Sequence, residues 1–344
     1  MIINDLFKIA SQSNASDVHL IAGKPPILRL DGELKAIPNT EILTRASIEK
    51  MVFSIITEKQ RDKFINEREL DISYEIAGFS RYRVNLHWEK DNIGLVARVI
   101  SQTIPTMEDL GLPPIVHRLI EREQGLILVT GPTGCGKSTT LAAMIKKINS
   151  IRFSNIITLE DPIEYIFQPE KSIIKQRQLG TDMLTFQDAL KHVLRQDPNV
   201  IMVGEMRDLE TIAATITLAE TGHLVLATLH THNAAQTIDR IIDVFPPHQQ
   251  AQVRLQLSMS LSGVISQNLL PKIGGGRVAA REILINTPAI ANIIRENKVP
   301  QIKTVIQTSA DVGMFSMDQN IKELLQNNLI DEPTALAHLT TTQK

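Results

Sequence analysis

This chain is short of cysteine, of aromatic residues and of net charge. It has one cysteine, Cys135, among 344 residues. It therefore has no disulfide framework and no four-cysteine zinc site, and we expect it in a reducing compartment. Aromatic residues make up 4% of the chain and the net charge is −2. A basic, aromatic-lined channel for nucleic acid is thus not expected, although net charge leaves a local one open.

Long apolar runs are missing as well. None approaches the roughly 18 residues that a membrane-spanning helix needs. The opening stretch, MIINDLFKIASQSNASD, is too polar for a signal peptide. We expect no membrane insertion and no export by a signal peptide. What remains is an ordinary globular composition of 43% apolar and 22% charged residues, in a chain long enough for two domains.

A glycine loop between an apolar run and a helical pattern is the strongest signal. Leu126–Val129 predicts a buried strand, and residues 131–138, GPTGCGKS, match G-x-x-x-x-G-K-[ST] at every fixed position. Apolar residues at helical spacing follow from Leu141 to Ile148. Strand, loop and helix in this order indicate a phosphate-binding P-loop rather than a glycine-rich turn.

The residue types of this loop suit ATP and Mg²⁺. Glycines let backbone N–H groups curl around phosphate oxygens, and the helix N-terminus adds about half a positive charge facing the same anion. Lys137 can reach the β- and γ-phosphates, and the Ser138 hydroxyl suits Mg²⁺. The predicted nucleotide-binding residues are Thr133, Gly134, Cys135, Gly136, Lys137, Ser138 and Thr139.

The pattern before the loop predicts a separate α+β domain over residues 1–100. It contains a short helix from Ile2, a hairpin that turns at Asp31-Gly32, two more helices and three strands, which end near Ala77, Glu89 and Ile100. Within the second of these strands Arg81 and Arg83 share one face, which by itself is typical of a solvated surface. Residues 101–112 contain Pro, Gly and polar residues without a clear period, which predicts a linker.

Residues 113–344 alternate strands with helices, which predicts an α/β domain built on a mostly parallel sheet. Beyond Pro246 the pattern predicts one long helix to about Asn268. A glycine loop, a strand over Val278–Ile285 and four further helices are expected after it.

Polar residues follow three of the apolar strands predicted for this sheet. The first ends in Glu160-Asp-Pro-Ile-Glu164, the next is followed by Gly204-Glu205, and the third by His230. Because ligands of open α/β sheets lie beyond the carboxyl ends of the strands, these groups would meet the phosphates. Alone, each has a structural interpretation as a turn, a helix-capping acid or a core histidine. Together beside a P-loop they indicate phosphoryl chemistry.

The acids of this set divide into two expected tasks. Glu205 would polarise the attacking water. Gly204 occupies the place of the aspartate that usually closes a Walker B strand. Metal contact would then fall to Ser138 and, directly or through water, to Glu160, Asp161 or Glu164.

Four motifs in this order resemble those of the secretion-type ATPases. They are residues 131–139 (Walker A), 158–164, TLEDPIE (Asp box), 203–208, VGEMRD (atypical Walker B), and 227–231, ATLHT (His box). The resemblance covers the whole chain and is nearest to the motors that retract type IV pili. It implies a PAS-like N-terminal domain and a RecA-like ATPase domain with a helical C-terminal extension. It also implies a cytoplasmic homohexamer at the inner-membrane base of the pilus machine.

The resemblance further implies residue roles and partners. Glu205 would be the catalytic glutamate, Glu160 and Glu164 the Asp-box acids, and His230 the residue that senses the nucleotide. Metal contact would fall to Ser138 and Glu160. Arginines of the N-terminal domain would reach the γ-phosphate, with Arg83 and Arg98 as the best matches and Arg81 behind them. The implied partners are an inner-membrane pilus platform protein and other pilus motor subunits, without direct contact to nucleic acid.

Four other functions stay open. Pilus-extension and type II secretion ATPases share this chemistry, but they usually carry a four-cysteine zinc motif and an extra N-terminal domain. An accessory retraction paralogue is indicated by Ala291, which stands where the C-terminal motif of the retraction motors has arginine. A RecA-like nucleic-acid translocase would need the basic, aromatic channel. A regulatory ring without turnover would not need Glu205.

Overall fold

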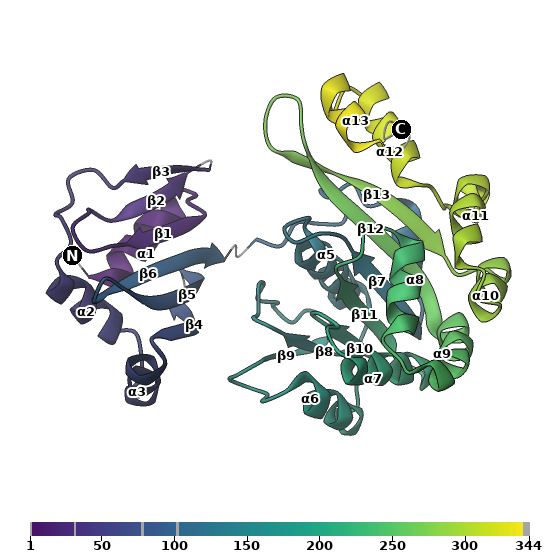
Figure 1. Cartoon of the computed structure of the whole chain (residues 1–344), viewed down its shortest axis with the longest axis horizontal. Helices are drawn as coiled ribbons and strands as arrows, with labels where there is room; N and C mark the ends of the chain where they lie inside the picture. The colour runs from purple at the N-terminus through teal and green to yellow at the C-terminus, as the bar shows by residue number, and fades with distance from the viewer. Residues whose placement is uncertain (1, 31, 77–78, 101–102, 340–344) are drawn as a thin grey trace. The chain divides into compact units, whose positions relative to one another are not determined.

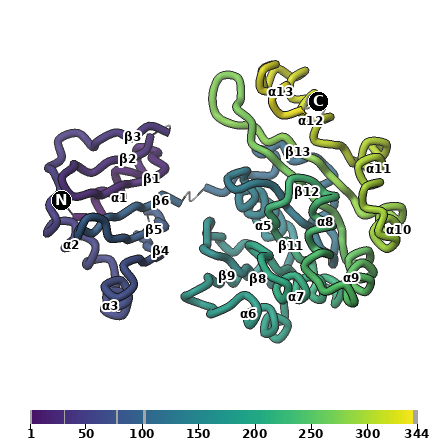
Figure 2. Tube along the Cα trace, in the orientation of Figure 1, coloured from purple at the N-terminus to yellow at the C-terminus, as the bar shows by residue number. Residues whose placement is uncertain are grey.

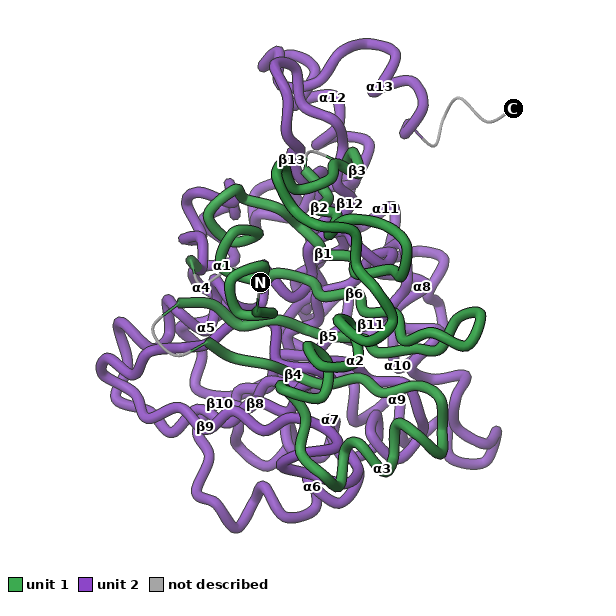
Figure 3. The backbone as a smooth tube through the Cα atoms, turned by 90° about the vertical axis from the view of Figure 1, so that its left-hand side faces the viewer, with its two compact units in different colours: residues 1–103 green, residues 104–344 purple. Residues whose placement is uncertain are grey.

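The computed structural model describes residues 2–30, 32–76, 79–100 and 103–339. The chain divides into two compact units, residues 1–103 and 104–344, which Figure 3 shows in different colours. Three sequence predictions touch positions outside the described residues: the turn residue Asp31, the strand end Ala77 and residues 101–102 of the linker.

Unit 1 is an α+β fold. In its described part, six strands form one antiparallel sheet in the order β3-β2-β1-β6-β5-β4 (Figure 1). Its PAS-like character remains a prediction. The elements are α1 (Ile3–Gln12), β1 (Asp17–Leu20), β2 (Ile27–Leu30), β3 (Glu33–Ala36), α2 (Arg45–Phe53), α3 (Glu58–Glu67), β4 (Glu69–Ile76), β5 (Ser80–Glu89) and β6 (Asn92–Ile100).

Alternation along β5 fixes which of its side chains enter the core of unit 1. Tyr82, Val84 and Leu86 are fully buried, whereas Arg83 between them is exposed. The Tyr82 hydroxyl donates a 2.8 Å hydrogen bond to the backbone oxygen of Phe7, on the buried face of α1. The predicted arginine face therefore points away from this core.

Unit 2 is an α/β fold on a seven-stranded sheet, counted over its described residues. The strand order is β13-β12-β7-β11-β10-β8-β9. The pair β12–β13 is antiparallel and the other pairs are parallel. The strands are β7 (Gly125–Thr130), β8 (Asn155–Glu160), β9 (Ile173–Gln178), β10 (Val200–Val203), β11 (Leu224–Leu229), β12 (Leu261–Pro271) and β13 (Arg277–Ile285).

Helices pack against this sheet, with α5 and α7 on β7, α6 on β8, and α8 on β12 and β13. Every residue of β7, β8, β10 and β11 is buried, as near-continuous apolar runs predict. The longer helices are α4 (Pro114–Ile120), α5 (Lys137–Ile151), α6 (Phe186–Val193), α7 (Leu209–Glu220), α8 (Ala234–Asp243), α9 (Pro247–Ser260), α10 (Pro288–Arg295), α11 (Ile302–Thr308), α12 (Met317–Gln326) and α13 (Glu332–His338).

Two predictions for this unit were wrong. The long helix expected to reach Asn268 ends at Ser260, and the chain continues as β12 beside β7. Residues 104–112, expected as linker, belong to unit 2, because Ile104, Met107 and Leu112 are buried in its core. This segment has too few apolar residues to show a period in the sequence, but these residues still anchor it in the core of unit 2.

After β13 the chain continues into the C-terminal helices, which Figure 2 traces in yellow-green and yellow. The helix α12 packs on β13, α11 on α8, and α10 on α9, so these helices extend unit 2. Within the described residues, no helix combines the length and apolarity that crossing a bilayer requires.

Candidate active site

The glycine loop lies where the sequence places it, between β7 and α5. Gly131, Gly134 and Gly136 have φ angles of +143°, +80° and +88°, a backbone conformation that side chains disfavour. A Cβ on Gly131 would lie 2.2 Å from the backbone oxygen of Gln267 on β12. The first glycine of the loop is therefore required both by its backbone conformation and by its contact with the neighbouring strand.

The N-terminus of α5 lacks the side-chain cap that neighbouring helices have. Asp208 caps α7 and Asn233 caps α8 through their side-chain oxygens, but the N-cap of α5 is Gly136 and no side chain caps it. The first N–H groups of a helix need acceptors, and the helix dipole favours an anion there. The end of α5 is thus suited to bind phosphate through its backbone.

Lys137 points back over the loop. Its Nζ donates hydrogen bonds to the backbone oxygens of Gly131 (2.8 Å) and Pro132 (3.1 Å) and lies 3.3 Å from Nδ1 of His230. Burial lowers the pKa of Lys137, partly offset by nearby acids such as Glu205. The ammonium group therefore lies at the centre of the loop, where phosphate oxygens would compete for its protons.

His230 connects this lysine to the predicted catalytic acid. Its Nε2 lies 3.0 Å from Oε1 of Glu205, and Thr133 Oγ1 lies 3.5 Å from its Nδ1. A lysine ammonium can only donate, so Nδ1 accepts and Nε2 carries the proton that is donated to Glu205. The three residues Lys137, His230 and Glu205, predicted separately from three strand ends, form one line of contacts.

Glu205 is held in its ionised form. Burial acts to raise the pKa of Glu205, but the hydrogen bond and charge of Arg207, helped by His230 and Lys137, outweigh it and leave the pKa below its ordinary value. Arg207 donates to Oε2 of Glu205 at 2.8 Å and lies 3.7 Å from Asp161. An ionised carboxylate beside the loop can accept a proton from water.

The two Asp-box acids differ in their surroundings. Glu160 is 6% exposed and accepts hydrogen bonds from Thr158 (2.6 Å) and Gln176 (3.1 Å), and burial raises its pKa. Glu164 is exposed, and its charge acts on Lys137. Glu160 is the last residue of β8 and belongs to the core of the sheet, whereas Glu164 lies on the segment that follows, at the surface beside the loop.

The magnesium prediction rests on donor chemistry. The described residues contain no group of three or more His, Cys, Asp and Glu side chains placed to hold a metal ion. Mg²⁺ in nucleotide sites is usually held by one or two side chains together with phosphate oxygens of the substrate. Ser138, in the first turn of α5, is suitable as such a side chain. Ser138 and Glu160 remain the predicted ligands.

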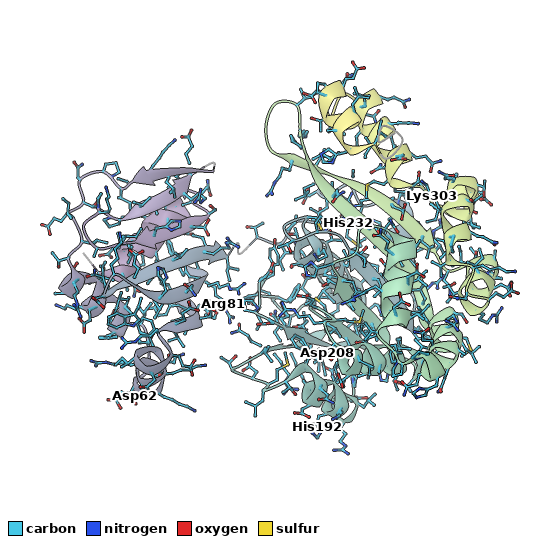
Figure 4. The ribbon with its side chains drawn as sticks, in the orientation of Figure 1. Asp62, Arg81, His192, Asp208, His232 and Lys303 are labelled. Atoms are coloured by element: carbon cyan, nitrogen blue, oxygen red, sulfur yellow. The ribbon has the colours of Figure 1, made fainter. Side chains whose placement is uncertain are left out.

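The predicted arginines lie on unit 1. Arg83 of β5 is directly paired with Arg98 of β6 across the sheet. Arg98 donates to Asp17 at 3.1 Å, and Arg81, labelled in Figure 4, donates to Ser73. The P-loop belongs to the other unit, and a role of these arginines at the nucleotide stays a prediction.

Sequence reasoning missed two residues that contact this site. Arg207 lay inside a quoted motif, but nothing in its spacing signalled the contact with Glu205. Gln267 was predicted to lie on a helix, but it lies on the strand β12. Its side-chain amide donates to the backbone oxygen of Cys135 at 2.7 Å. Gly263 and the β-branched pair Val264-Ile265 were the available signal for that strand.

These features define a P-loop ATPase with a RecA-like nucleotide-binding fold. The chain belongs to the type II/IV secretion system protein family, whose model matches residues 1–328. It is 48% identical over 335 residues to the type IV pilus retraction ATPase PilT of Pseudomonas aeruginosa, with 97% of each chain covered.

Two further comparisons agree. The chain is 47% identical over 311 residues to a twitching motility protein of Neisseria gonorrhoeae, with 90% of this chain and 83% of that protein covered. Among solved structures, it is similar to the crystal structure of the pilus retraction motor PilT and bound ADP. That match has a TM-score of 0.93 and 46% identity and covers 98% of this chain and 96% of the other. The α/β fold and the family predicted from the sequence are thus confirmed.

Proposed function

We propose that this chain is a Mg²⁺-dependent ATPase that acts as a homohexameric motor for type IV pilus retraction. The observation that carries the chemistry is the line of contacts from Lys137 through His230 to Glu205. It joins the residue that binds phosphate to the residue that acts on water. The names of the similar proteins, which specify pilus retraction and twitching motility, support the physiological role. The ADP in the similar crystal structure supports an adenine nucleotide.

Binding begins with the loop and the uncapped end of α5. Backbone N–H groups donate to the phosphate oxygens, and Lys137 redirects its N–H hydrogen bonds from the loop carbonyls to the same oxygens. Mg²⁺, bound with the nucleotide, neutralises phosphate charge, and Ser138 and Glu160 are the residues that would hold it. Thr133, Gly134, Cys135, Gly136 and Thr139 complete the proposed nucleotide contacts.

Glu205 then acts on the water that attacks the γ-phosphate. It stays ionised at neutral pH because Arg207 and His230 stabilise its charge, so it can accept a proton from that water. Glu164, exposed beside the loop, adds a second acid at the same edge.

His230 is suited to sense the nucleotide. Lys137 has three protons, and the structure directs them at Gly131, Pro132 and His230. A phosphate oxygen that accepts one of these hydrogen bonds alters the contact between Lys137 and His230. The hydrogen bond from His230 to Glu205 then changes as well. Nucleotide binding is thereby communicated to the catalytic acid.

The ring supplies the remaining charge. Like charges directly opposite each other on a sheet are unfavourable, and Arg83 with Arg98 forms such a pair. Asp17 already compensates Arg98, and an anion beside Arg83 would add to that compensation. We place these arginines of one copy, with Arg81 behind them, at the γ-phosphate of a neighbouring copy. An arginine in that position contributes about 10³ to 10⁵ in rate.

The ring would work in the cytoplasm at the inner-membrane base of the pilus machine. Its partners there are a platform protein and other motor subunits. An accessory role in retraction is the second candidate, because Ala291 on α10 replaces an arginine expected of the main retraction motors.

The biochemical test uses three variants. Lys137→Ala should abolish both nucleotide binding and turnover, whereas Glu205→Gln should bind ATP and fail to hydrolyse it. Lys147→Ala removes a lysine from the same helix about 15 Å farther along and should keep wild-type turnover. Wild-type rates in Lys137→Ala would overturn the P-loop assignment, and lost binding in Glu205→Gln would overturn the role of that acid.

The cellular test separates the candidate roles. Removing this protein from a piliated host should leave surface pili in place and abolish twitching motility. Loss of surface pili would instead indicate an extension motor. Twitching that continues with reduced pulling force would indicate the accessory role.

A further inference from the structure

We infer that Gln267 is a positioning residue for the nucleotide, because its side-chain amide sets the orientation of a peptide group in the P-loop. Gln267 lies on β12, outside the motifs that define the site. The inference rests on the proposed nucleotide binding and adds a residue to it.

The contacts run through three elements. Thr140 of α5 donates from its hydroxyl to Oε1 of Gln267 at 2.9 Å, and Nε2 of Gln267 donates to the backbone oxygen of Cys135 at 2.7 Å. The exposed fractions are 2% for Thr140, 2% for Gln267 and 3% for Cys135. Helix, strand and loop are thus joined by two buried hydrogen bonds, which are costly to leave unmade.

The carbonyl group of Cys135 determines which way the Gln267 amide faces, because a carbonyl oxygen can only accept a hydrogen bond. A hydroxyl that donates to Oε1 leaves Nε2 on the side of Cys135, where a donor is needed for the carbonyl oxygen. The reversed amide would place its oxygen against the carbonyl oxygen of Cys135, which leaves two acceptors without a donor, whereas the Thr140 hydroxyl can donate or accept and so adjusts to the amide. The arrangement of Thr140, Gln267 and Cys135 therefore has one consistent set of donors and acceptors.

Holding the Cys135 oxygen also orients the next N–H group. In a trans peptide the C=O and the following N–H point in opposite directions. With the Cys135 oxygen held toward β12, the N–H of Gly136 points away from that strand. Gly136 is the N-cap of α5 and has a φ of +88°. Its N–H belongs to the set of backbone donors that a P-loop directs at phosphate.

Gln267 also contacts the other end of the loop. A Cβ on Gly131 would lie 2.2 Å from the backbone oxygen of Gln267, so the two backbones are in direct contact. One residue of β12 thereby limits the movement of both the first and the last part of the loop. The adjacent Ser266 makes a contact of another kind, which joins two strands and does not reach the loop. Its hydroxyl lies 2.9 Å from the hydroxyl of Thr130 on β7.

The chemistry predicts which measurement changes. P-loop backbone donors contact phosphates that ADP and ATP share. Loss of the Gln267 amide should therefore weaken the binding of ADP and the binding of ATP by the same factor. It should raise the KM for ATP more than it lowers kcat, because Glu205 and its partners are untouched.

The experiment measures ADP and ATP affinity by titration of the full-length protein, together with thermal melting. In Gln267→Met, which keeps side-chain length without an amide, we expect both dissociation constants to rise about tenfold, the effect of losing one buried hydrogen bond. Thr140→Val should give a smaller rise in the same direction, and Thr140→Ser, which keeps the donor, should restore wild-type affinity. Ser266→Ala is the matched control; it should lower the melting temperature without changing affinity.

Wild-type protein is titrated first, so that the two ideas fail separately. If it binds neither nucleotide, the proposed function fails. If it binds and Gln267→Met binds within twofold of it, the positioning role is wrong. The role is also wrong if Ser266→Ala weakens nucleotide binding as much as Gln267→Met does. If Gln267→Met does not fold, Thr140→Val decides, and unchanged affinity in that variant overturns the inference.

Discussion

Two glutamates near the ends of neighbouring strands show how surroundings assign roles at the scale of single residues. Burial raises the pKa of Glu160 at the end of β8. Beyond β10, burial acts in the same direction on the pKa of Glu205, but Arg207 outweighs it and holds that pKa low. Burial disfavours the ionised form of a carboxyl group, whereas a neighbouring positive charge favours it. Glu205 is therefore the more readily ionised of the two.

Another acid, which is buried, links the His230 loop to the C-terminal helices. Glu282 of β13 is 8% exposed, and its Oε1 accepts a 2.9 Å hydrogen bond from the backbone N–H of Ala234, the first residue of α8. Burial raises the pKa of Glu282, while backbone hydrogen bonds from Ala234 and Met317 and the charge of Lys303 act to lower it, and Asp318 acts to raise it. Figure 4 labels Lys303 on α11.

This raised pKa predicts a pH-dependent effect of Glu282→Gln. The folded chain prefers protonated Glu282, so the stability from this group is present below its ordinary pKa of 4.5 and is lost as pH rises through the raised folded value. An amide does not ionise. The melting temperature of Glu282→Gln relative to wild type should therefore increase as pH rises above about 4.5.

Melting curves of both proteins between pH 4 and pH 8, without nucleotide, test this. A difference in melting temperature that stays constant with pH would show that ionisation of Glu282 contributes nothing. Glu323→Gln on α12 is the control, since its side chain lies in an exposed hydrogen bond with Asn320.

Single residues were predictable where the spacing along the sequence determines how the side chains lie in the fold. The P-loop needs its glycines, Lys137 and Ser138 at fixed spacing, and the strand ends give Glu205 and His230 because parallel strands bring their ends together. Arg207 and Gln267 were not predictable in the same way. Their roles depend on where an exposed arginine folds back and on which strand lies beside β7.

At the scale of elements, a strand was predicted correctly where its apolar residues form a continuous run. The fully buried strands β7, β8, β10 and β11 were all found from their apolar runs. The strand β9, with the sequence IIKQRQ, was missed because it is the edge strand of the sheet and only partly buried. The strand β12 was missed because its apolar residues continue the spacing of α9. Tertiary pairing with β7 and β13 overrides that local pattern.

The N-terminal cap of α7 gives a quantitative expectation. The carboxylate of Asp208, labelled in Figure 4, accepts a 2.7 Å hydrogen bond from the N–H of Thr211. Asp208→Ala should lower the free energy of unfolding by about 1 kcal/mol. Chemical denaturation measures it. Glu210→Ala removes an exposed acid from the same turn without a cap bond and should cost less, so an equal or larger loss in Glu210→Ala would contradict the capping role.

At the scale of the whole molecule, the described residues of each unit have a core of their own, and unit 2 has a second, smaller one where α12 and α13 pack on β12 and β13. The change of pattern near residue 100 was visible in the sequence. The inclusion of residues 104–112 in unit 2 was not, because the burial of Ile104 and Met107 depends on partners from distant elements such as α5. The Nζ of Lys146 on α5 donates to the backbone oxygen of Ile104 at 2.6 Å, which fixes the start of this segment.

The division into two units makes the arginine prediction a statement about assembly. Arg83 and Arg98 lie on unit 1 and the P-loop on unit 2. If arginines of one copy serve the nucleotide of the next, turnover should rise with the hexamer population as protein concentration increases. Arg83→Ala should still form hexamers and should hydrolyse ATP at least about 10³-fold more slowly. ATPase rate and mass photometry on the same samples measure both quantities.

Lys63→Ala is the control for this last experiment, because it removes an exposed positive charge from the same unit. In the described structure, Lys63 lies on α3 and pairs only with Glu67, at 3.7 Å. A surface ion pair of this kind contributes little, so Lys63→Ala should turn over like wild type. Monomers that hydrolyse ATP as fast as hexamers would place the whole site within one chain. If Arg83→Ala also hydrolyses ATP like wild type, Arg83 belongs to a solvated face of the sheet, and Arg207 of unit 2, which contacts Glu205, becomes the candidate for the catalytic charge.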